Sequence, residues 1–246
     1  MPATPAWPPK SLPRLFVRAP LIEGALVELD ANQANYLGNV MRLGAGAEVL
    51  LFDGSSGEWL ARIAEATKKR MRLAVEQRTR EPESIPDVWL AFAPVKRAGT
   101  DWLVEKATEL GAARLVPVIT QRTVAERVRL ERLEAISIEA AEQCGRTRLP
   151  QIAEPVHLRR FVEEIDSTRH FYFADESGGE PAASAFGEGP AVILIGPEGG
   201  FAREERDFLL GSGASAISLG PRILRAETAA LAALSCFMAI VGDWAP

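Results

Sequence analysis

Two segments of the chain combine glycines, arginines and carboxylates in patterns that suit ligand binding and chemistry. Residues 195–201 read Ile-Gly-Pro-Glu-Gly-Gly-Phe, and glycines in such a segment let the backbone approach a ligand closely. Residues 219–228 read Leu-Gly-Pro-Arg-Ile-Leu-Arg-Ala-Glu-Thr, with two arginines three positions apart. A cation can stabilise negative charge that develops on a substrate, and a carboxylate can accept a proton.

Each segment also has a plain structural explanation. The glycines at residues 195–201 suit a tight turn that needs positive φ angles. Glu227 or Thr228 can cap a helix, and Arg222 can simply be solvated. No Lys-Ser or Lys-Thr pair follows the glycines, which disfavours a phosphate-binding loop of the P-loop type.

The elements predicted around these segments explain why they should meet. Residues 191–195 are apolar on both faces, which is typical of a strand in a parallel sheet covered on both sides. A helix is predicted at residues 203–210, a strand at 216–219 and a closing helix at 227–241. Both segments therefore follow strands, and ligands of open α/β sheets bind beyond the carboxyl ends of strands.

The preceding stretch has the same alternation. A strand at residues 88–93, a helix at 100–110 and a strand at 114–119 form a predicted βαβ unit. A long helix is predicted at residues 127–143 and a further strand at 171–174. The fold class is therefore α/β with a mostly parallel sheet.

The first third of the chain has a different pattern. Short apolar runs alternate with turn signals between residues 15 and 75, which predicts a small β-barrel with one short helix at 32–42. The loop at residues 53–57 reads as a hairpin connection. The polar segment 80–86 contains two prolines and predicts a boundary between domains 1–80 and 81–246.

Composition narrows the class of protein. The 246 residues carry a net charge of −5, but residues 1–80 hold 11 basic against 8 acidic residues and residues 81–246 hold 17 against 25. This basic excess at the front permits binding to nucleic acid. No apolar stretch approaches the roughly 20 residues that span a bilayer. Two distant cysteines favour a reducing, cytoplasmic compartment and offer no disulfide or metal site.

Four motifs together resemble one family. Besides 195–201 and 219–228, these are Lys-Ala-Thr-Glu-Leu-Gly at 106–111 and Glu-Ala-Ala-Glu-Gln-Cys-Gly-Arg at 139–146. In this order they resemble the RsmE family of ribosomal RNA uridine-N3 methyltransferases, and the likeness runs from Arg14 to the carboxyl terminus. The resemblance implies a SPOUT domain with a trefoil knot, a PUA-like RNA-binding barrel and a homodimer. It further implies S-adenosylmethionine as cofactor and, as substrate, the uridine of 16S ribosomal RNA conventionally numbered 1498.

The resemblance also implies a site. Arg225 is the candidate for stabilising charge on the uridine, and Glu198 and Glu227 are candidates for accepting its proton or orienting the base. The implied cofactor-binding residues are Leu194, Ile195, Gly196, Pro197, Gly199, Gly200, Leu219, Gly220, Ile223, Leu224 and Thr228.

Seven basic residues are the predicted contacts to RNA phosphates, which position a substrate without reading its bases. They are Arg14, Arg18, Arg42, Lys96, Arg97, Arg122 and Arg146. The chain departs from the family at 35–42, where relatives commonly have histidines, and at 121–123, which reads Gln-Arg-Thr in place of Glu-Arg-Ser. The RNA contacts of the barrel are therefore less firmly implied than the cofactor site.

Three other functions are alternatives to this one. A SPOUT methyltransferase that acts on another RNA or on a ribose 2′-hydroxyl is compatible with the Gly-Pro-Glu-Gly-Gly segment, but the Arg-Ile-Leu-Arg-Ala-Glu-Thr sequence at 222–228 favours the uridine-N3 branch. A noncatalytic RNA-binding assembly factor is disfavoured by the intact glycines and arginines. A nucleotide-binding oxidoreductase lacks the fingerprint of glycines after the first strand.

Overall fold

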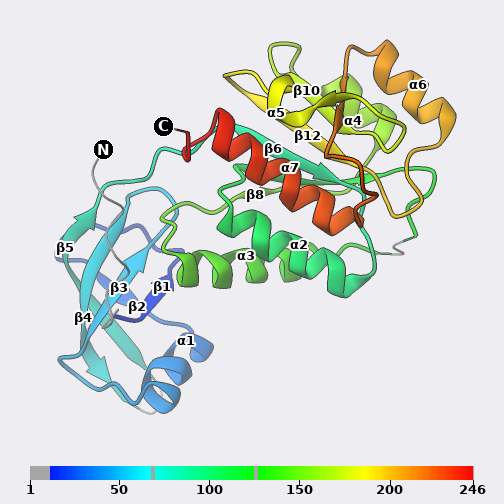
Figure 1. The fold of residues 1–246 in the computed structure, drawn as a ribbon. Helices are drawn as coiled ribbons and strands as arrows, with labels where there is room; N and C mark the ends of the chain where they lie inside the picture. The colour runs from blue at the N-terminus through cyan, green and yellow to red at the C-terminus, as the bar shows by residue number, and fades with distance from the viewer. Residues whose placement is uncertain (1–11, 68–69, 125–126, 246) are drawn as a thin grey trace. The chain divides into compact units, whose positions relative to one another are not determined.

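The computed structural model describes residues 12–67, 70–124 and 127–245 (Figure 1). The chain divides into two compact units: unit 1 comprises Met1–Glu83 and Glu142–Arg148, and unit 2 comprises Ser84–Ala141 and Leu149–Pro246. Nearly all of unit 1 matches the predicted first domain, but the short segment 142–148 was expected in the second. None of the described helices is both long and apolar enough to cross a membrane.

Unit 1 is built on a five-stranded sheet in the order β1-β3-β4-β5-β2. The β1 and β3 strands are parallel, and the other pairs are antiparallel. Alternate side chains of these strands point inward, so Val49 and Leu51 of β3 are fully buried against Leu73 of β5. The strands are β1 (Arg14–Phe16), β2 (Leu26–Glu28), β3 (Glu48–Phe52), β4 (Glu58–Ala66) and β5 (Met71–Arg80).

The predicted helix at 32–42 is present in two parts. The first is α1 (Ala31–Asn35), which begins at a capping box formed by Asp30 and Gln33. It continues directly into a π-helical turn, η1 (Tyr36–Val40). Arg42 follows with a φ of 57°, which is uncommon for a residue other than glycine.

Unit 2 is built on an eight-stranded sheet in which every pair is parallel. Its main path runs β11-β13-β10-β12-β6-β7-β8, and β9 pairs with the far end of β7. The strands are β6 (Val88–Phe92), β7 (Arg114–Ile119), β8 (Gln151–Ile152), β9 (Val156–His157), β10 (His170–Ala174), β11 (Glu180–Pro181), β12 (Ala191–Ile195) and β13 (Ser215–Ser218).

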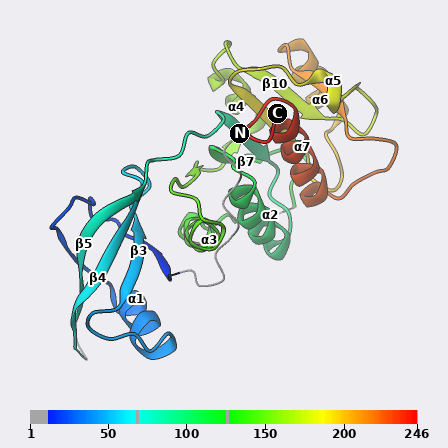
Figure 2. The ribbon, with the colours of Figure 1, turned by 60° about the vertical axis from the view of Figure 1, so that its left-hand side comes forward.

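Helices cover both faces of this sheet, so β12 is buried at all five positions as its apolar sequence predicts. One core joins the sheet to α2, α3, α5 and α7, and the second joins it to α4 and α6. Figure 2 shows α2 and α7 packed side by side. The helices are α2 (Arg97–Glu109), α3 (Leu130–Cys144), α4 (Leu158–Glu164), α5 (Ala182–Ala185), α6 (Arg203–Gly211) and α7 (Ala226–Ile240).

The predicted fold class, a mostly parallel α/β domain preceded by a small curled sheet, is confirmed. Each strongly patterned element lies within three residues of its predicted bounds. The short elements β8, β9, α4, β11 and α5 were not predicted, because segments of two to seven residues carry too few periods of a pattern. The knot stays a prediction.

Candidate functional site

A cavity of about 460 Å³ lies at the carboxyl ends of three neighbouring strands of unit 2, β10, β12 and β13. Its walls come from the turn that follows each strand, together with Arg206 of α6 and the start of α7. Both segments singled out in the sequence contribute to it. The sheet therefore brings 195–201 and 219–228 together as predicted.

The first wall follows β12. Gly200 has a φ of +66°, and its N–H donates to the carbonyl of Pro197 at 2.9 Å, which closes a tight turn. A Cβ at Gly196 would lie 3.0 Å from the ring of Phe201, which packs edge-on against Phe173 of β10. The glycines thus serve the turn itself and also leave the backbone open to the cavity.

This turn is held from outside by the loop that follows β7. The guanidinium of Arg122 donates to the carbonyl of Gly199 at 2.6 Å. The carboxylate of Glu205 accepts from the N–H of Gln121 at 2.7 Å and from the N–H of Ala202 at 3.0 Å. Arg122 therefore contacts the predicted cofactor loop directly.

The second wall follows β13. Gly220 has a φ of +102°, and its N–H donates to the hydroxyl of Ser218 at 3.3 Å. Arg225 is the N-cap residue that precedes α7, and its carbonyl accepts from the N–H of Ala229 at 2.8 Å. The side chains of Arg222 and Arg225 are both exposed and line the cavity. The cavity therefore presents two cations beside the glycine turns.

The third wall is formed by the last residue of β10 and the turn that follows it. No pattern in the sequence had singled out this turn. The wall consists of Ala174, Asp175, Glu176, Ser177 and Gly178. Asp175 is 5% exposed at its side chain and forms an ion pair with Arg206 of α6 at 2.7 Å. The strand at 171–174 was predicted, so the rule that ligands bind at carboxyl ends would have pointed to this turn as well.

Most of the predicted cofactor-binding residues line the cavity, as do Arg225 and Glu198. Four predicted site residues do not. Leu194 is fully buried in the core beneath it, and Gly199 turns its carbonyl toward Arg122. Glu227 and Thr228 lie outside the lining, and Glu227 faces the first turn of α2, where a Cβ at Gly99 would lie 4.0 Å from its carboxyl carbon.

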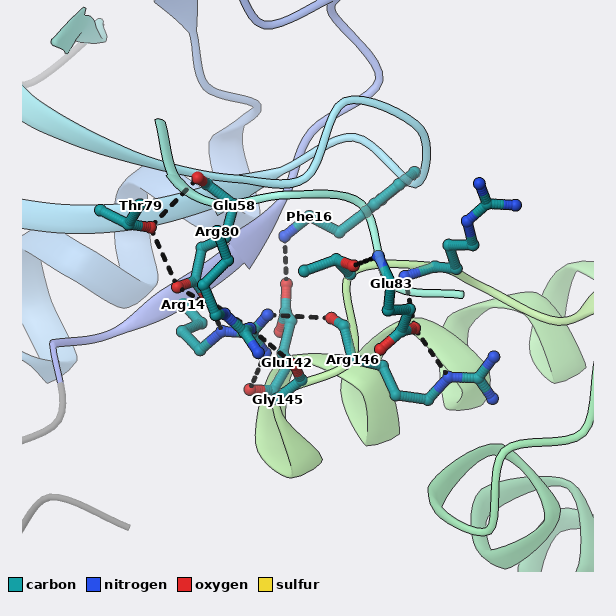
Figure 3. Close-up of polar contacts among 11 residues, drawn as sticks. Arg14, Phe16, Glu58, Thr79, Arg80, Glu83, Glu142, Gly145 and Arg146 are labelled. Atoms are coloured by element: carbon teal, nitrogen blue, oxygen red, sulfur yellow. Dashed lines mark hydrogen bonds and ion pairs between the residues drawn. The ribbon is translucent and has the colours of Figure 1, made fainter. Parts of the chain in front are cut away.

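Two predicted RNA contacts are buried in unit 1, as Figure 3 shows. The guanidinium of Arg14 donates to Glu58 at 2.7 Å and to the carbonyls of Glu142 and Arg146 at 2.9 Å each. The side chain of Arg146 is 6% exposed and lies 3.4 Å from the carboxylate of Glu83. Their burial removes both guanidinium groups from the surface where phosphates bind, which corrects the expectation for these two residues.

The other predicted RNA contacts are exposed. Arg18 lies over the ring of Phe16 at 5.9 Å, and Arg42 follows the π-helical turn. Lys96 is the residue at which α2 begins, and Arg97 lies 3.9 Å from Asp101. All four of these side chains are exposed to solvent.

Glu58 is the carboxylate that pairs with both Arg14 and Arg80 in unit 1. Its carboxylate accepts from Arg14 and also from Arg80 at 2.7 and 3.0 Å (Figure 3). Burial by itself would raise the pKa of Glu58, but the hydrogen bonds from Arg80 and Arg14 hold it below its ordinary value. Glu58 is therefore charged at neutral pH and compensated by two arginines.

A larger cavity of about 600 Å³ lies elsewhere in unit 2, beside Trp89 near the start of β6 and Arg114 at the start of β7. It contains none of the predicted site residues. In addition, no cluster of three or more potential metal ligands occurs in the described ranges.

Comparisons with known proteins cover both units. A family model described as an RNA methyltransferase domain matches residues 81–238, and one described as an RNA methyltransferase PUA domain matches residues 29–76. Ribosomal RNA small subunit methyltransferase E of Synechocystis is 34% identical over 93% of this chain and 78% of its own length. The protein of that name from Rickettsia conorii is 30% identical over 90% of this chain and 93% of its own length.

Two solved structures are similar along nearly the whole chain. Ribosomal RNA small subunit methyltransferase E of Neisseria gonorrhoeae, bound to S-adenosylmethionine, has a TM-score of 0.88 at 29% identity and covers 96% of this chain and 100% of its own. A methyltransferase of Legionella pneumophila, also in complex with S-adenosylmethionine, has a TM-score of 0.85 at 32% identity over 95% of this chain and 100% of its own.

Proposed function

Since the chain belongs to the RNA methyltransferase family that includes ribosomal RNA small subunit methyltransferase E, we propose that it methylates N3 of a uridine in 16S ribosomal RNA. The methyl donor is S-adenosylmethionine, and the target is the uridine conventionally numbered 1498. The observation that carries this proposal is the cavity at the ends of β10, β12 and β13, which joins the two predicted segments.

The residues of this cavity fit the proposed cofactor. Its volume of about 460 Å³ lies within the range of roughly 300–1,000 Å³ that small-molecule sites occupy. Gly196 and Gly200 both line the cavity, and a Cβ at Gly196 would lie 3.0 Å from the ring of Phe201. The lining combines apolar groups such as Ile195 and Leu224 with polar groups that can orient a nucleoside. When bound, S-adenosylmethionine supplies a methyl group that is already activated by its sulfonium.

The protein must align uridine N3 with the methyl group and remove the N3 proton. Loss of this proton leaves negative charge that spreads onto O2 and O4 of the base. We assign Arg225 to the stabilisation of that charge, because its exposed guanidinium lines the cavity beside the glycine turns. Glu198 lines the same cavity and is assigned as the group that accepts the proton or orients the base.

The substrate RNA would be positioned by exposed cations. Arg18 and Arg42 provide these in unit 1, and Lys96 and Arg97 provide them in unit 2. Phosphate contacts of this kind set position and leave the choice of base to the active site. A cytoplasmic location is part of this proposal, since the proposed substrate is ribosomal RNA.

We further propose that the enzyme is a homodimer. Ile223 is 84% exposed although it is a large apolar side chain in a segment that lines the cavity. Trp102 of α2 is also exposed, at 42%. Apolar groups at such positions are often covered by a partner. Sedimentation equilibrium should give twice the mass of the chain, and a monomer at micromolar concentration would contradict the proposal.

The function is tested by methyl transfer from labelled S-adenosylmethionine to small ribosomal subunits and to free 16S RNA, both lacking the modification. Mass spectrometry of the nucleosides should identify a single N3-methyluridine. A 2′-O-methylated nucleoside would instead assign the reaction to ribose. Cofactor binding without labelling of either RNA would point to a different RNA substrate.

A further inference from the structure

The turn after β10 holds a carboxylate that the proposed reaction does not use. Glu176 lines the cavity and is exposed, and its side chain makes no hydrogen bond or ion pair that involves another described residue. The carboxylate of its neighbour Asp175 already forms an ion pair with the guanidinium of Arg206. Glu176 is therefore an acceptor available to a ligand.

The turn that carries Glu176 is firmly built. The Asp175 carboxylate accepts from the N–H of Ser177 at 2.9 Å as well as from Arg206, and the N–H of Asp175 donates to the carbonyl of Ile217 in β13 at 3.1 Å. Gly179 packs so closely on the backbone of β13 at Ala216 that no Cβ would fit. The position of residue 176 is thus fixed by α6 and β13.

The side chain of Glu176 lies across the cavity wall from the glycine turn that follows β12. A Cβ added at Gly200 would lie 2.6 Å from the Oε1 atom of Glu176. The carboxylate of Glu176 and the backbone of residue 200 therefore lie side by side in the wall of the cavity. The φ of +66° at residue 200 favours glycine, and without a Cβ there the carboxylate of Glu176 can lie against the backbone.

This placement suits a nucleoside. Strands β10 and β12 are parallel neighbours, so a carboxylate follows one strand while a glycine turn follows the next. In dinucleotide-binding sheets, an acidic residue near a glycine turn accepts hydrogen bonds from ribose hydroxyls. A carboxylate has two oxygens and can accept from two vicinal hydroxyls at once.

We propose that Glu176 binds the ribose of the methyl donor, with its two carboxylate oxygens accepting hydrogen bonds from the 2′- and 3′-hydroxyls. This inference rests on the proposed function, because it takes S-adenosylmethionine as the ligand. Glu176 is then a specificity-determining residue for nucleosides that carry both hydroxyls, and it takes no part in moving the uridine proton.

The test compares S-adenosylhomocysteine with its 2′-deoxy analogue by isothermal titration calorimetry on the full chain. Wild-type protein should bind the deoxy analogue about tenfold more weakly, as expected for loss of a hydrogen bond to a charged acceptor. Glu176→Ala should bind S-adenosylhomocysteine about tenfold more weakly than wild type does. Its affinities for S-adenosylhomocysteine and for the 2′-deoxy analogue should differ by less than twofold. Glu176→Gln should lie between them, because an amide offers one acceptor oxygen.

Glu188→Gln is the matched control, since Glu188 is an exposed glutamate of unit 2 outside the cavity lining. It should retain both the affinity and the discrimination of wild type. Undiminished discrimination in Glu176→Ala would overturn the assignment of Glu176 alone. Failure of wild-type protein to bind S-adenosylhomocysteine would overturn the proposed function and this inference together.

Discussion

Arginine residues in this chain divide into those whose charge is used inside the protein and those whose charge faces solvent. The sequence shows seven cations of equal standing, but Arg14 meets partners more than 120 residues away in the chain. Arg225 by contrast is exposed in the cavity. Residue type therefore predicted candidates, and only the tertiary contacts separated the arginines buried inside the protein from those that face solvent or the cavity.

Arg225 should be essential for the chemical step. We expect Arg225→Ala to lower the rate of methyl transfer at saturating substrates by about 100-fold or more, as loss of a group that stabilises developing charge does. Single-turnover transfer measures this. Arg203→Ala is the matched control, because Arg203 is an exposed surface cation that lies 4.0 Å from Asp207. Normal turnover by Arg225→Ala would remove that residue from the mechanism.

Arg122 was predicted to bind RNA phosphate. Its guanidinium also donates to the carbonyl of Gly199, which suggests a second role in holding the turn that follows β12. We expect Arg122→Ala to weaken cofactor binding several-fold, because the carbonyl of Gly199 loses a charged hydrogen bond and the turn is less well held. Titration of each ligand separately distinguishes the roles. If Arg122→Ala lowered only the affinity for RNA, Arg122 would act as a phosphate contact and not through the cofactor loop. Lys96→Ala is the comparison, because it is expected to lower the affinity for RNA and leave that for the cofactor unchanged.

At the scale of elements, the site is made by turns whose positions depend on which strands are neighbours. The segments after β12 and β13 were found from their glycines and arginines, whereas the turn after β10 was not. Its sequence, Asp-Glu-Ser-Gly-Gly, is also typical of a solvated loop. What distinguishes it is the position of β10 between β12 and β13, and strand order is a property of long-range pairing.

The strands of unit 1 should show a pH dependence through Glu58. Its pKa in the folded state is below the ordinary value of 4.5, so its contribution to stability is present above that pH and is lost as pH falls further. We expect Glu58→Gln to destabilise unit 1 by about 3 kcal/mol at pH 7, because Arg14, which is buried, loses its counter-charge.

Hydrogen exchange of β4 and β5 amides at pH 7 and at pH 3.5 measures this effect. The difference between wild type and Glu58→Gln should be smaller at the lower pH. Glu65→Gln on the same strand is the control, because Glu65 is half exposed and lies 4.0 Å from Arg72. A difference between wild type and Glu58→Gln that stayed constant with pH would contradict the assignment.

At the scale of the whole molecule, charge is divided between the two parts of the chain. Arg14 is buried and so cannot contribute to the basic surface of residues 1–80. Arg18 and Arg42 are exposed, so this part of the chain still presents cations that can attract RNA. The acidic excess of residues 81–246 leaves fewer places for phosphates there. Unit 1 is thus the part of the chain whose cations should dominate nonspecific RNA affinity.

Substitution of both exposed cations tests this division. The double variant Arg18→Ala, Arg42→Ala should weaken RNA binding and reduce the slope of log K against log salt by about 1 to 2, since each lost phosphate contact removes roughly 0.7 to 0.9. Cofactor affinity should not change. Arg160→Ala, which removes an exposed cation of α4, should leave the slope nearly as it is. An unaltered slope in the double variant would remove unit 1 from this role.

The sequence predicted the architecture where long patterns exist, as in the buried β12 and the helices α2 and α7. It could not predict that Glu142–Arg148 packs with unit 1, because this depends on Arg14 and Arg80 donating to backbone carbonyls distant in the chain. The knot has no local signature either, since it is a property of the path of the whole chain.

The inclusion of Glu142–Arg148 in unit 1 has a consequence for synthesis on the ribosome. When residues up to Glu83 have emerged, Arg14 and Arg80 still lack the carbonyls of Glu142, Gly145 and Arg146 that they bind in the finished protein. The amino-terminal unit therefore cannot reach its final structure until some 60 further residues have been translated. Its maturation is tied to that of unit 2, so a prematurely terminated chain would leave the buried Arg14 without the carbonyls of Glu142 and Arg146 and be a substrate for quality control.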